Sequence, residues 1–440
     1  MSQSEAQRCL LCKKPFCSQA CPVHTDVPTC MRLYREGRIE EAARILFENN
    51  PLSAITSQVC DWQHLCYGHC ILNRKGIPVR WYEIEQEISM PYLLRAHITP
   101  GAENGRSVAI VGGGPVGITA AIKLREKGYA VTVFDDNARL GGVLRYGIPR
   151  FRLGEQFINA YERIFEEAGI RFQGNTCIGK DLSLAELRQR FDAVCIGGGA
   201  WSPRRMHIPG EDNPKVIYAL EYLKNPDAFQ LGRKVIVIGG GNVTMDASRT
   251  AVRRGHDTWV YYRKTFGNMP ANSIEVRAAQ ADGVKFELFQ VPVEVKQDTL
   301  VIRRCENVTA DDGSVITRMI DGTDFEVPFD NMIVAISENV DYSLFGDTMP
   351  ELDKRGRIFV DSLQQTSLPG VFLAALLKGS VHIGPNPVIH ADVSPPRSNR
   401  RKRPAILPRY IGAGHIAGRK RFFRPFSAGG SFGPWPGKYR

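Results

Sequence analysis

The chain has 440 residues, which is long for one domain and indicates several packed units rather than a peptide hormone or a disulfide mini-domain. A composition of 43% hydrophobic and 23% charged residues is typical of a globular protein and excludes disorder of the whole chain. The formal net charge of +11 comes from residues 378–440, which hold 13 Lys and Arg but one acidic residue. The remainder is close to neutral and gives no support for a nucleic-acid partner.

No stretch approaches the roughly 18–20 apolar residues of a membrane-spanning helix, and the first residues, MSQSEAQR, lead into no apolar signal core. We therefore expect a cytoplasmic protein with no membrane partner. Thiols stay reduced in that compartment, so closely spaced cysteines favour metal binding or catalysis over disulfides.

Eight of the 11 cysteines lie between residues 9 and 70. Seven of them form two sets: Cys9, Cys12, Cys17 and Cys21, then Cys60, Cys66 and Cys70. Compact cysteine loops that end in Cys-Pro, as the first set does, are typical of iron–sulfur ligation, and two clusters would need one further ligand. A cysteine-rich zinc site is the alternative. Cys30 lies outside both sets, and we expect it to be a small buried side chain on a helix.

Beyond Cys30, Ile39–Phe47 and Trp81–Leu94 have the apolar spacing of helices, so the two cysteine sets are predicted to lie in loops braced by short helices. Residues 1–100 are accordingly predicted to form an α-helical iron–sulfur domain. Three histidines fall in this region, and we expect structural roles for them rather than ligation: His24, His64 and His69.

A complete βαβ unit follows, with a strand, a glycine-rich turn, a helix and a second strand: Ser107–Val111, Gly112–Gly117, a helix to Lys127, and Ala130–Phe134. This pattern predicts a dinucleotide site in which Gly112 permits the sharp turn, Gly114 lets a pyrophosphate approach, and Gly117 allows close helix packing. Asp135 ends the second strand, where an acid accepts hydrogen bonds from a ribose that has no 2′-phosphate.

A second copy comprises Lys234–Ile238, the turn Gly239–Thr244, a helix to about Arg254, and Asp257–Tyr262. Gly239, Gly241 and Asn242 are its predicted cofactor-binding residues, and Thr244 replaces the third glycine. Arg263 and Lys264 follow the second strand and suit the 2′-phosphate of NADP, so we favour NADPH over NADH. The alternative for these two cations is an ordinary solvated strand end.

An acid-ended unit followed by a base-ended one implies FAD first and NADPH second, with hydride passing from nicotinamide to flavin. The chemistry belongs to the cofactors, so we expect no acid–base triad.

Several segments, in this order, carry a family resemblance: CLLCKKPFCSQACP, NPLSAITSQVC, VAIVGGGPVGITAA, GIPRFRL, IPGED and VIVIGGGNVTMD. The chain resembles the glutamate synthase small-subunit family, whose module is similar to the N-terminal part of dihydropyrimidine dehydrogenase. The resemblance implies an electron-input subunit that passes electrons from NADPH through FAD and two 4Fe-4S clusters. It also implies a hetero-oligomer, in which the acceptor is a larger catalytic subunit or a ferredoxin-like protein.

The resemblance implies interleaved cluster ligands: Cys9, Cys12, Cys17 and Cys70 for one cluster, and Cys21, Cys60 and Cys66 for the other. Glu85 is the implied eighth ligand, with Gln86 as the less favoured choice. The alternative for Glu85 is an ordinary exposed helix residue.

The resemblance also places Gly141, Gly142 and Gly147 near the flavin, has Arg152 order that loop, and puts Gly199 at a crossover beside the FAD. It implies that the strands Asp192–Ile196 and Asn331–Ile336 lead out of the FAD domain and back into it. The predicted fold is α/β, glutathione-reductase-like, without the cysteine pair of disulfide reductases. Its predicted domains are an iron–sulfur domain (1–100), an FAD domain (101–232 and 329–376), an NADPH domain (233–328) and an irregular tail (377–440).

The resemblance stops after Ala374. Residues 378–440 contain 9 Pro and 9 Gly and have no helical period, which is typical of low complexity. A shifted reading frame is the favoured explanation, ahead of a natural basic tail and of an appendage that binds nucleic acid or membrane; weakened FAD binding is its expected consequence. Two other functions stay open. One is an NAD(P)H-oxidising subunit of a dihydropyrimidine dehydrogenase or ferredoxin oxidoreductase, and the other is a C-terminally damaged, non-catalytic metal-binding protein.

Overall fold

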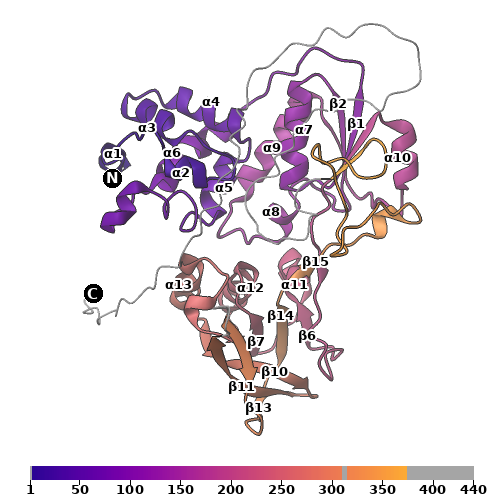
Figure 1. Cartoon of the computed structure of the whole chain (residues 1–440). Helices are drawn as coiled ribbons and strands as arrows, with labels where there is room; N and C mark the ends of the chain where they lie inside the picture. The colour runs from indigo at the N-terminus through magenta and orange to yellow at the C-terminus, as the bar shows by residue number, and fades with distance from the viewer. Residues whose placement is uncertain (1, 310–314, 374–440) are drawn as a thin grey trace. The chain divides into compact units, whose positions relative to one another are not determined.

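The structure is a computed structural model that describes residues 2–309 and 315–373 (Figure 1). Its N-terminal part is helical: α1 (Ser2–Gln7), α2 (Phe16–Ala20), α3 (Val27–Arg35), α4 (Ile39–Asn49), α5 (Ser53–Val59) and α6 (Trp81–Leu93). In α3, Val27, Met31 and Tyr34 recur at helical spacing and are all buried. Asp26 caps α3 by accepting a hydrogen bond from the Thr29 amide at 3.3 Å. The predicted helices around residues 39–47 and 81–94 are confirmed.

The first sheet is parallel, in the order β16-β4-β1-β2-β3. Its strands and main helices are β1 (Ser107–Val111), β2 (Ala130–Phe134), β3 (Arg171–Gln173), β4 (Ala193–Ile196), β16 (Val371–Leu373), α7 (Pro115–Glu126), α9 (Glu155–Ala168) and α10 (Leu184–Arg190). Along β1, Val108 and Ile110 pack with α7 and α9, whereas Ala109 and Val111 pack with α10. Both faces of this sheet are therefore covered, as is usual for parallel sheets.

The second sheet is also parallel, in the order β6-β14-β7-β8-β9. Its strands and helices are β6 (Val216–Tyr218), β7 (Lys234–Gly239), β8 (Asp257–Tyr262), β9 (Lys285–Leu288), β14 (Asn331–Ala335), α11 (Ala219–Lys224), α12 (Asn242–Arg253) and α13 (Ser273–Asp282). Val235 and Val237 of β7 pack against these helices, while Ile236 and Ile238 pack in the opposite core with residues of an antiparallel sheet. That sheet comprises β10 (Gln290–Val295), β11 (Thr299–Thr309), β12 (Val315–Met319) and β13 (Phe325–Pro328).

One predicted strand lies in a different sheet from the one expected. The strand Asn331–Ala335 pairs in parallel with β7 and β6 of the second sheet, so its predicted place in the FAD domain is wrong. Its apolar residues are buried between the two cores of the second sheet, and the pairing fills the position between β6 and β7. The part of the chain that leaves the first sheet after β4 and returns to it at β16 therefore includes the strands 216–218 and 331–335. Its two connections pair with each other through β5 (Ser202–Pro203) and β15 (Glu338–Asn339).

The helical part and the first sheet share one apolar core. Leu52 and Ile55 at α5, together with Leu93 of α6, are buried in the same cluster as α7 and α9. The Tyr161 hydroxyl of α9 donates a hydrogen bond to the Pro51 carbonyl at 2.8 Å. Within the residues described, no helix is both long and apolar enough to cross a membrane. The predicted tail, 377–440, lies outside the described residues.

Candidate cluster and dinucleotide sites

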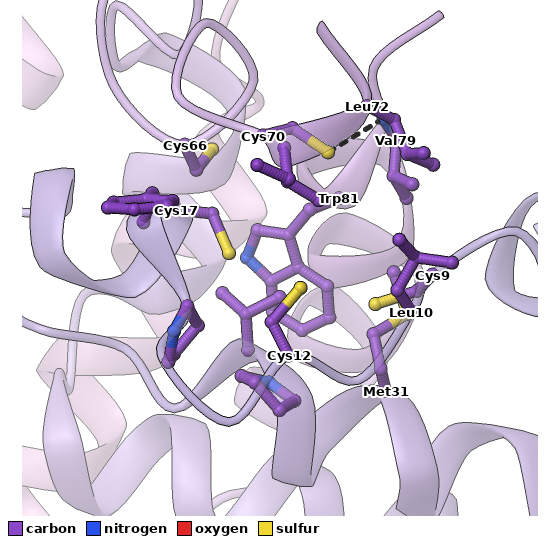
Figure 2. A pocket seen from close by; sticks show the side chains of 15 residues that line it. Cys9, Leu10, Cys12, Cys17, Met31, Cys66, Cys70, Leu72, Val79 and Trp81 are labelled. Atoms are coloured by element: carbon purple, nitrogen blue, oxygen red, sulfur yellow. Dashed lines mark hydrogen bonds between the residues drawn. The ribbon is translucent and has the colours of Figure 1, made fainter. Parts of the chain in front are cut away.

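Four of the predicted cluster ligands line a first cavity: Cys9, Cys12, Cys17 and Cys70 (Figure 2). Local contacts hold their segments in place. The Arg35 guanidinium of α3 donates to the carbonyls of Ala6 and Cys9, and the Val79 amide donates to the Cys70 sulfur at 3.5 Å. Figure 2 shows cysteine side chains around the Trp81 ring, which also lines the cavity. The cavity therefore has a sulfur-rich and otherwise largely apolar lining.

The other four predicted ligands line a second cavity: Cys21, Cys60, Cys66 and Glu85. Cys21 directly follows α2 and Cys60 directly follows α5, so two helix ends deliver their thiols to this cavity. Cys66 and Trp81 line both cavities, which makes the two cavities close neighbours. Seven of the eight residues line one cavity each, in the groups that the family resemblance implies, and Cys66 lines both. Their role as ligands stays a prediction.

Glu85 is not the exposed helix residue of the alternative reading, because it is only 9% exposed. Burial raises the pKa of Glu85 to about 8 and also raises the pKa of the Cys60 and Cys66 thiols around it. Burial thus favours the neutral forms of these groups, and the positive charge of bound iron would favour the ionised forms that act as ligands, so this lining fits a bound metal cluster. Gln86 instead donates its side-chain amide to the Ser57 carbonyl at 2.7 Å.

The predicted ligands line the walls of the two cavities and do not converge on one central position. In the part of the chain that the structure describes, no three His, Cys, Asp or Glu side chains are grouped as a single metal ion would require. The three histidines of the cysteine region, His24, His64 and His69, are not among the residues that line either cavity. His64 pairs with Asp61 at 2.7 Å and His69 with the Leu65 carbonyl at 2.9 Å. Cys30 is fully buried in α3, as expected.

The first glycine turn has two positions where nearby backbone leaves no room for a side chain and one that stays open. A Cβ on Gly112, whose φ is +103°, would lie 2.5 Å from the Gly197 carbonyl oxygen, and one on Gly117 would lie 1.9 Å from the Gly112 oxygen. A Cβ on Gly114 would meet nothing closer than the Gly142 Cα, at 3.7 Å. Gly114 precedes α7, so the open space lies at a helix N-terminus, where a pyrophosphate binds favourably.

Asp135 is buried at the end of β2 and holds the glycine turn. Its carboxylate accepts hydrogen bonds from the Gly113 amide at 2.6 Å and the Asn137 amide at 2.8 Å. Burial raises the pKa of Asp135, and these hydrogen bonds oppose that rise. Sequence reasoning missed the contact with Gly113, although a glycine there is informative because a Cβ would lie 3.2 Å from the carboxylate.

A second loop packs onto the first glycine turn. The Gly141 amide donates to the Gly113 carbonyl at 2.9 Å, and a Cβ on Gly142 would lie 2.6 Å from the Gly114 Cα. Gly142 precedes the short helix α8 (Val143–Tyr146), and Gly147 follows it. Gly199 lies beyond β4, with a φ of +76°. The structure therefore brings Gly141 and Gly142 to the turn, with Gly147 one short helix away.

Arg152 lies in the loop after α8, but its guanidinium reaches the second dinucleotide domain. It forms ion pairs with Asp246 of α12 at 2.6 Å and Glu275 of α13 at 2.9 Å. Arg249 joins Glu275 at 2.8 Å, so the pairs form a network that is largely buried. Sequence reasoning gave Arg152 a role within its own loop and missed these partners. An acidic residue, Asp246, within the segment VTMDASR was the signal that a buried cation pairs with this helix.

The second glycine turn repeats the open middle position. A Cβ on Gly239 would lie 2.2 Å from the Ala335 carbonyl oxygen, whereas a Cβ on Gly241 would meet nothing within 4 Å. Thr244 fills the third position: its hydroxyl accepts from the Gly241 amide and donates to the Ala335 carbonyl, both at 3.2 Å. The Asn242 side-chain oxygen accepts from the Asn272 amide at 2.9 Å. Asn242 therefore anchors the loop before α13.

Two cations follow β8, and they are not equivalent. Lys264 donates its ammonium to the Val315 carbonyl at 2.9 Å. Arg263 is exposed, and its side chain has no hydrogen bond or ion pair among the described residues. Of these two cationic side chains, that of Arg263 is therefore the one available to bind an anion.

Two family models match this chain. The model described as pyridine nucleotide-disulphide oxidoreductase matches residues 106–375, and the model described as dihydropyrimidine dehydrogenase domain II, 4Fe-4S cluster, matches residues 1–91. The glutamate synthase (NADPH) small chains of Azospirillum brasilense and Escherichia coli strain K12 are each 32% identical to it. These matches cover 85% and 86% of this chain and 83% and 87% of those proteins, respectively.

Two solved structures share the fold. FprA from Mycobacterium tuberculosis in complex with NADPH has a TM-score of 0.53 at 21% identity, covering 64% of this chain and 80% of that one. A 2-naphthoyl-CoA reductase complex has a TM-score of 0.51 at 18% identity, covering 82% of this chain and 51% of that one. At these identities the likeness concerns the fold alone, and it agrees with the predicted α/β class.

Proposed function

The chain belongs to the pyridine nucleotide-disulphide oxidoreductases and, among them, to the glutamate synthase small-chain family, and on this premise we propose that it is an electron-input subunit. It takes hydride from NADPH onto FAD and passes the electrons through two 4Fe-4S clusters to a larger partner. The placement of eight candidate ligands around two adjoining cavities, in one chain with two dinucleotide folds, carries this proposal.

The chain's own residues bind and position the cofactors. The open spaces at Gly114 and Gly241 lie at the N-termini of α7 and α12, where backbone amides suit pyrophosphates. Arg263 is placed to hold the 2′-phosphate of NADPH. When bound, FAD accepts the hydride and the clusters accept single electrons. The Arg152 network links the flavin-side loop to the NADPH domain and so orients one dinucleotide fold toward the other.

The partner completes the reaction. Relatives are small chains of glutamate synthase or beta subunits of enzymes such as the NADP-dependent formate dehydrogenase of Moorella thermoacetica, so we infer a hetero-oligomer with a larger subunit. Glutamate synthesis is the reaction that the two small-chain matches favour, because they cover 83% and 87% of those proteins. Because the input module is shared across these relatives, the acceptor is identified through the partner and not through this chain.

The test is anaerobic purification of the full chain, followed by iron and flavin assays and titration with NADPH. We expect about eight irons and one FAD per chain, and a flavin absorbance that bleaches on addition of NADPH. Absence of both iron and flavin after anaerobic reconstitution would contradict the proposal. Iron without flavin would show that the clusters assemble but that the redox chain is broken at its first step.

Paired variants test the ligand assignment. Cys66→Ala should lower iron content most, because Cys66 lines both cavities, whereas Cys30→Ala should leave iron unchanged, because Cys30 is buried and is not among the residues that line either cavity. Glu85→Ala should lower iron content, and Gln86→Ala should not. Equal iron content in the two variants of a pair would contradict the assignment of Cys66 or Glu85, respectively, as a cluster ligand.

A further inference from the structure

The first cavity opens at an unusual patch of apolar surface. Leu10 and Phe16 line the cavity and yet are 62% and 48% exposed. Ile77 is 53% exposed, and its carbonyl accepts a hydrogen bond from the Arg8 guanidinium, which joins the segment around residue 77 to the one around residue 10. Large exposed apolar side chains gathered around a candidate redox site indicate a surface that another molecule covers.

The same surface has a one-sided charge. Segments 8–17 and 70–80 contain six Arg and Lys and no Asp or Glu. Two of the six, Arg8 and Arg80, pair with the buried Glu5. The other four are exposed and form no ion pair within the described ranges: Lys13, Lys14, Arg74 and Lys75. The patch is thus apolar in its middle and basic at its edge, in a chain whose body is near neutral.

The position of the second cavity sets the direction of electron flow. Thr56 of α5 and Cys60 at its end line that cavity, while Ile55 of the same helix is buried in the core shared with α7 and α9 of the first dinucleotide fold. The second cavity therefore adjoins the FAD side. If both cavities hold clusters, electrons from FAD reach the second cavity first and leave from the first cavity, which adjoins the exposed patch.

Resting on the proposed function, we propose that this docking surface, formed by Leu10, Phe16, Ile77, Lys13, Lys14, Arg74 and Lys75, binds the electron-accepting protein. The acceptor presents an apolar contact ringed by Asp and Glu, since interfaces combine an apolar centre with a charged rim of complementary sign. A protein acceptor, rather than an anionic membrane, is favoured because the patch surrounds the cavity that supplies the electrons. Each NADPH yields NADP⁺, one proton and two electrons, which reduce two one-electron acceptors.

The experiment compares two haem proteins of opposite charge, acidic cytochrome b5 and basic cytochrome c, as acceptors for the full chain with NADPH. At low ionic strength we expect a lower KM for cytochrome b5, and this preference should vanish in about 0.5 M salt. Lys13→Glu/Lys14→Glu should raise the KM for cytochrome b5 roughly tenfold and lower that for cytochrome c. Arg74→Glu/Lys75→Glu should do the same, and it keeps the test valid if the first variant loses iron.

The matched control is Lys354→Glu/Arg355→Glu, a pair of adjacent exposed cations in the 315–373 segment, which should change neither KM. Reduction of a neutral quinone should be the same in all variants. If the wild-type protein fails to reduce that quinone with NADPH, the proposed function fails. If it reduces the quinone but shows no salt-dependent preference for cytochrome b5, the docking surface is refuted alone. Binding to anionic phosphatidylserine vesicles that Lys13→Glu/Lys14→Glu abolishes, with both KM values unchanged, would assign the patch to a membrane and overturn the proposal.

Discussion

The two βαβ units of this chain share a backbone plan but differ in how their loops are closed. In each unit the first strand pairs in parallel with the second over five residues. The first unit ends in a buried acid, Asp135, that holds its own glycine turn. The second ends in Arg263, which faces solvent, and closes its turn through the Thr244 hydroxyl. We therefore propose that the shared fold positions a pyrophosphate in each unit and that the strand ends distinguish one cofactor from the other.

The glycines show which positions the chain needs for itself. A Cβ on the first glycine of either turn would strike a carbonyl of the neighbouring strand or of the loop after it, as Gly112 and Gly239 show. At the middle glycines there is room: a Cβ on Gly114 would meet the Gly142 Cα at an ordinary 3.7 Å, and one on Gly241 would meet no described atom within 4 Å. Packing explains the first pair, and we propose that ligand binding explains the second. Substitutions at the two kinds of position should therefore have different effects.

The largest expected effect follows from Gly117→Ala. The added Cβ would lie 1.9 Å from the Gly112 carbonyl oxygen, so the turn must move. We expect a lower melting temperature and a flavin content below about a tenth of wild type. Gly114→Ala should keep the wild-type melting temperature of the flavin-free protein and lose flavin affinity, because its methyl group occupies only the open space. Equal melting temperatures for the two flavin-free variants would contradict this division.

The next effect concerns two arginine networks, one buried and one exposed. Arg152→Met leaves Asp246 and Glu275 without their shared cation, and we expect it to lower the free energy of unfolding by about 3–5 kcal/mol at pH 7.5. Arg139→Met, which breaks exposed pairs with Glu162 and Glu155, should lower it by less than about 1 kcal/mol. Urea denaturation of both variants measures the difference.

The pH dependence of Arg152→Met sharpens this contrast. Burial raises the pKa of Asp246 to about 6, above its ordinary value. A carboxyl with a raised pKa in the folded state contributes stability that is present below about pH 4 and lost as the pH rises through 6. Because Arg152 opposes the rise, its removal should make the loss larger and extend it above pH 6. The stability difference from wild type should therefore shrink between pH 7.5 and pH 5; a difference that is constant with pH would show that Arg152 acts through packing alone.

A smaller effect is expected at the strand end of the second unit. Arg263→Ala should weaken NADPH binding by about 1.5–3 kcal/mol, the range for hydrogen bonds to charged groups, and leave NADH binding unchanged. Lys264→Ala should weaken NADPH binding less, because the Lys264 ammonium already donates to the Val315 carbonyl. Titration calorimetry with both nucleotides separates the two residues. Equal losses for NADPH and NADH would place Arg263 away from the 2′-phosphate.

Local patterns made much of this architecture predictable. The strands 107–111, 130–134 and 257–262 have the predicted bounds, because each is an apolar run bordered by glycine or charge. The sheet that Asn331–Ala335 joins was not predictable in this way, since an apolar run fits an interior position in either parallel sheet. The partners of Arg152 were missed for a related reason: they lie 94 and 123 residues away, and periodicity carries no information about such pairs. The roles of the cysteines and glycines stay predictions that the geometry accommodates.

The smallest effect tests the third position of the two turns, where Gly117 and Thr244 differ. Thr244→Ser keeps the hydroxyl that bridges the Gly241 amide and the Ala335 carbonyl, and loses one buried methyl group, so we expect a loss of about 0.8 kcal/mol. Thr244→Val keeps the size and removes the hydroxyl, so each backbone group loses its hydrogen bond to the side chain, which should lower stability further, by about 1 kcal/mol. If Thr244→Val were as stable as Thr244→Ser, the Thr244 side chain would contribute through packing and its hydroxyl would add no stability. A larger loss for Thr244→Val would mean that the second unit replaces the close backbone approach of Gly117 with a hydrogen-bonded bridge.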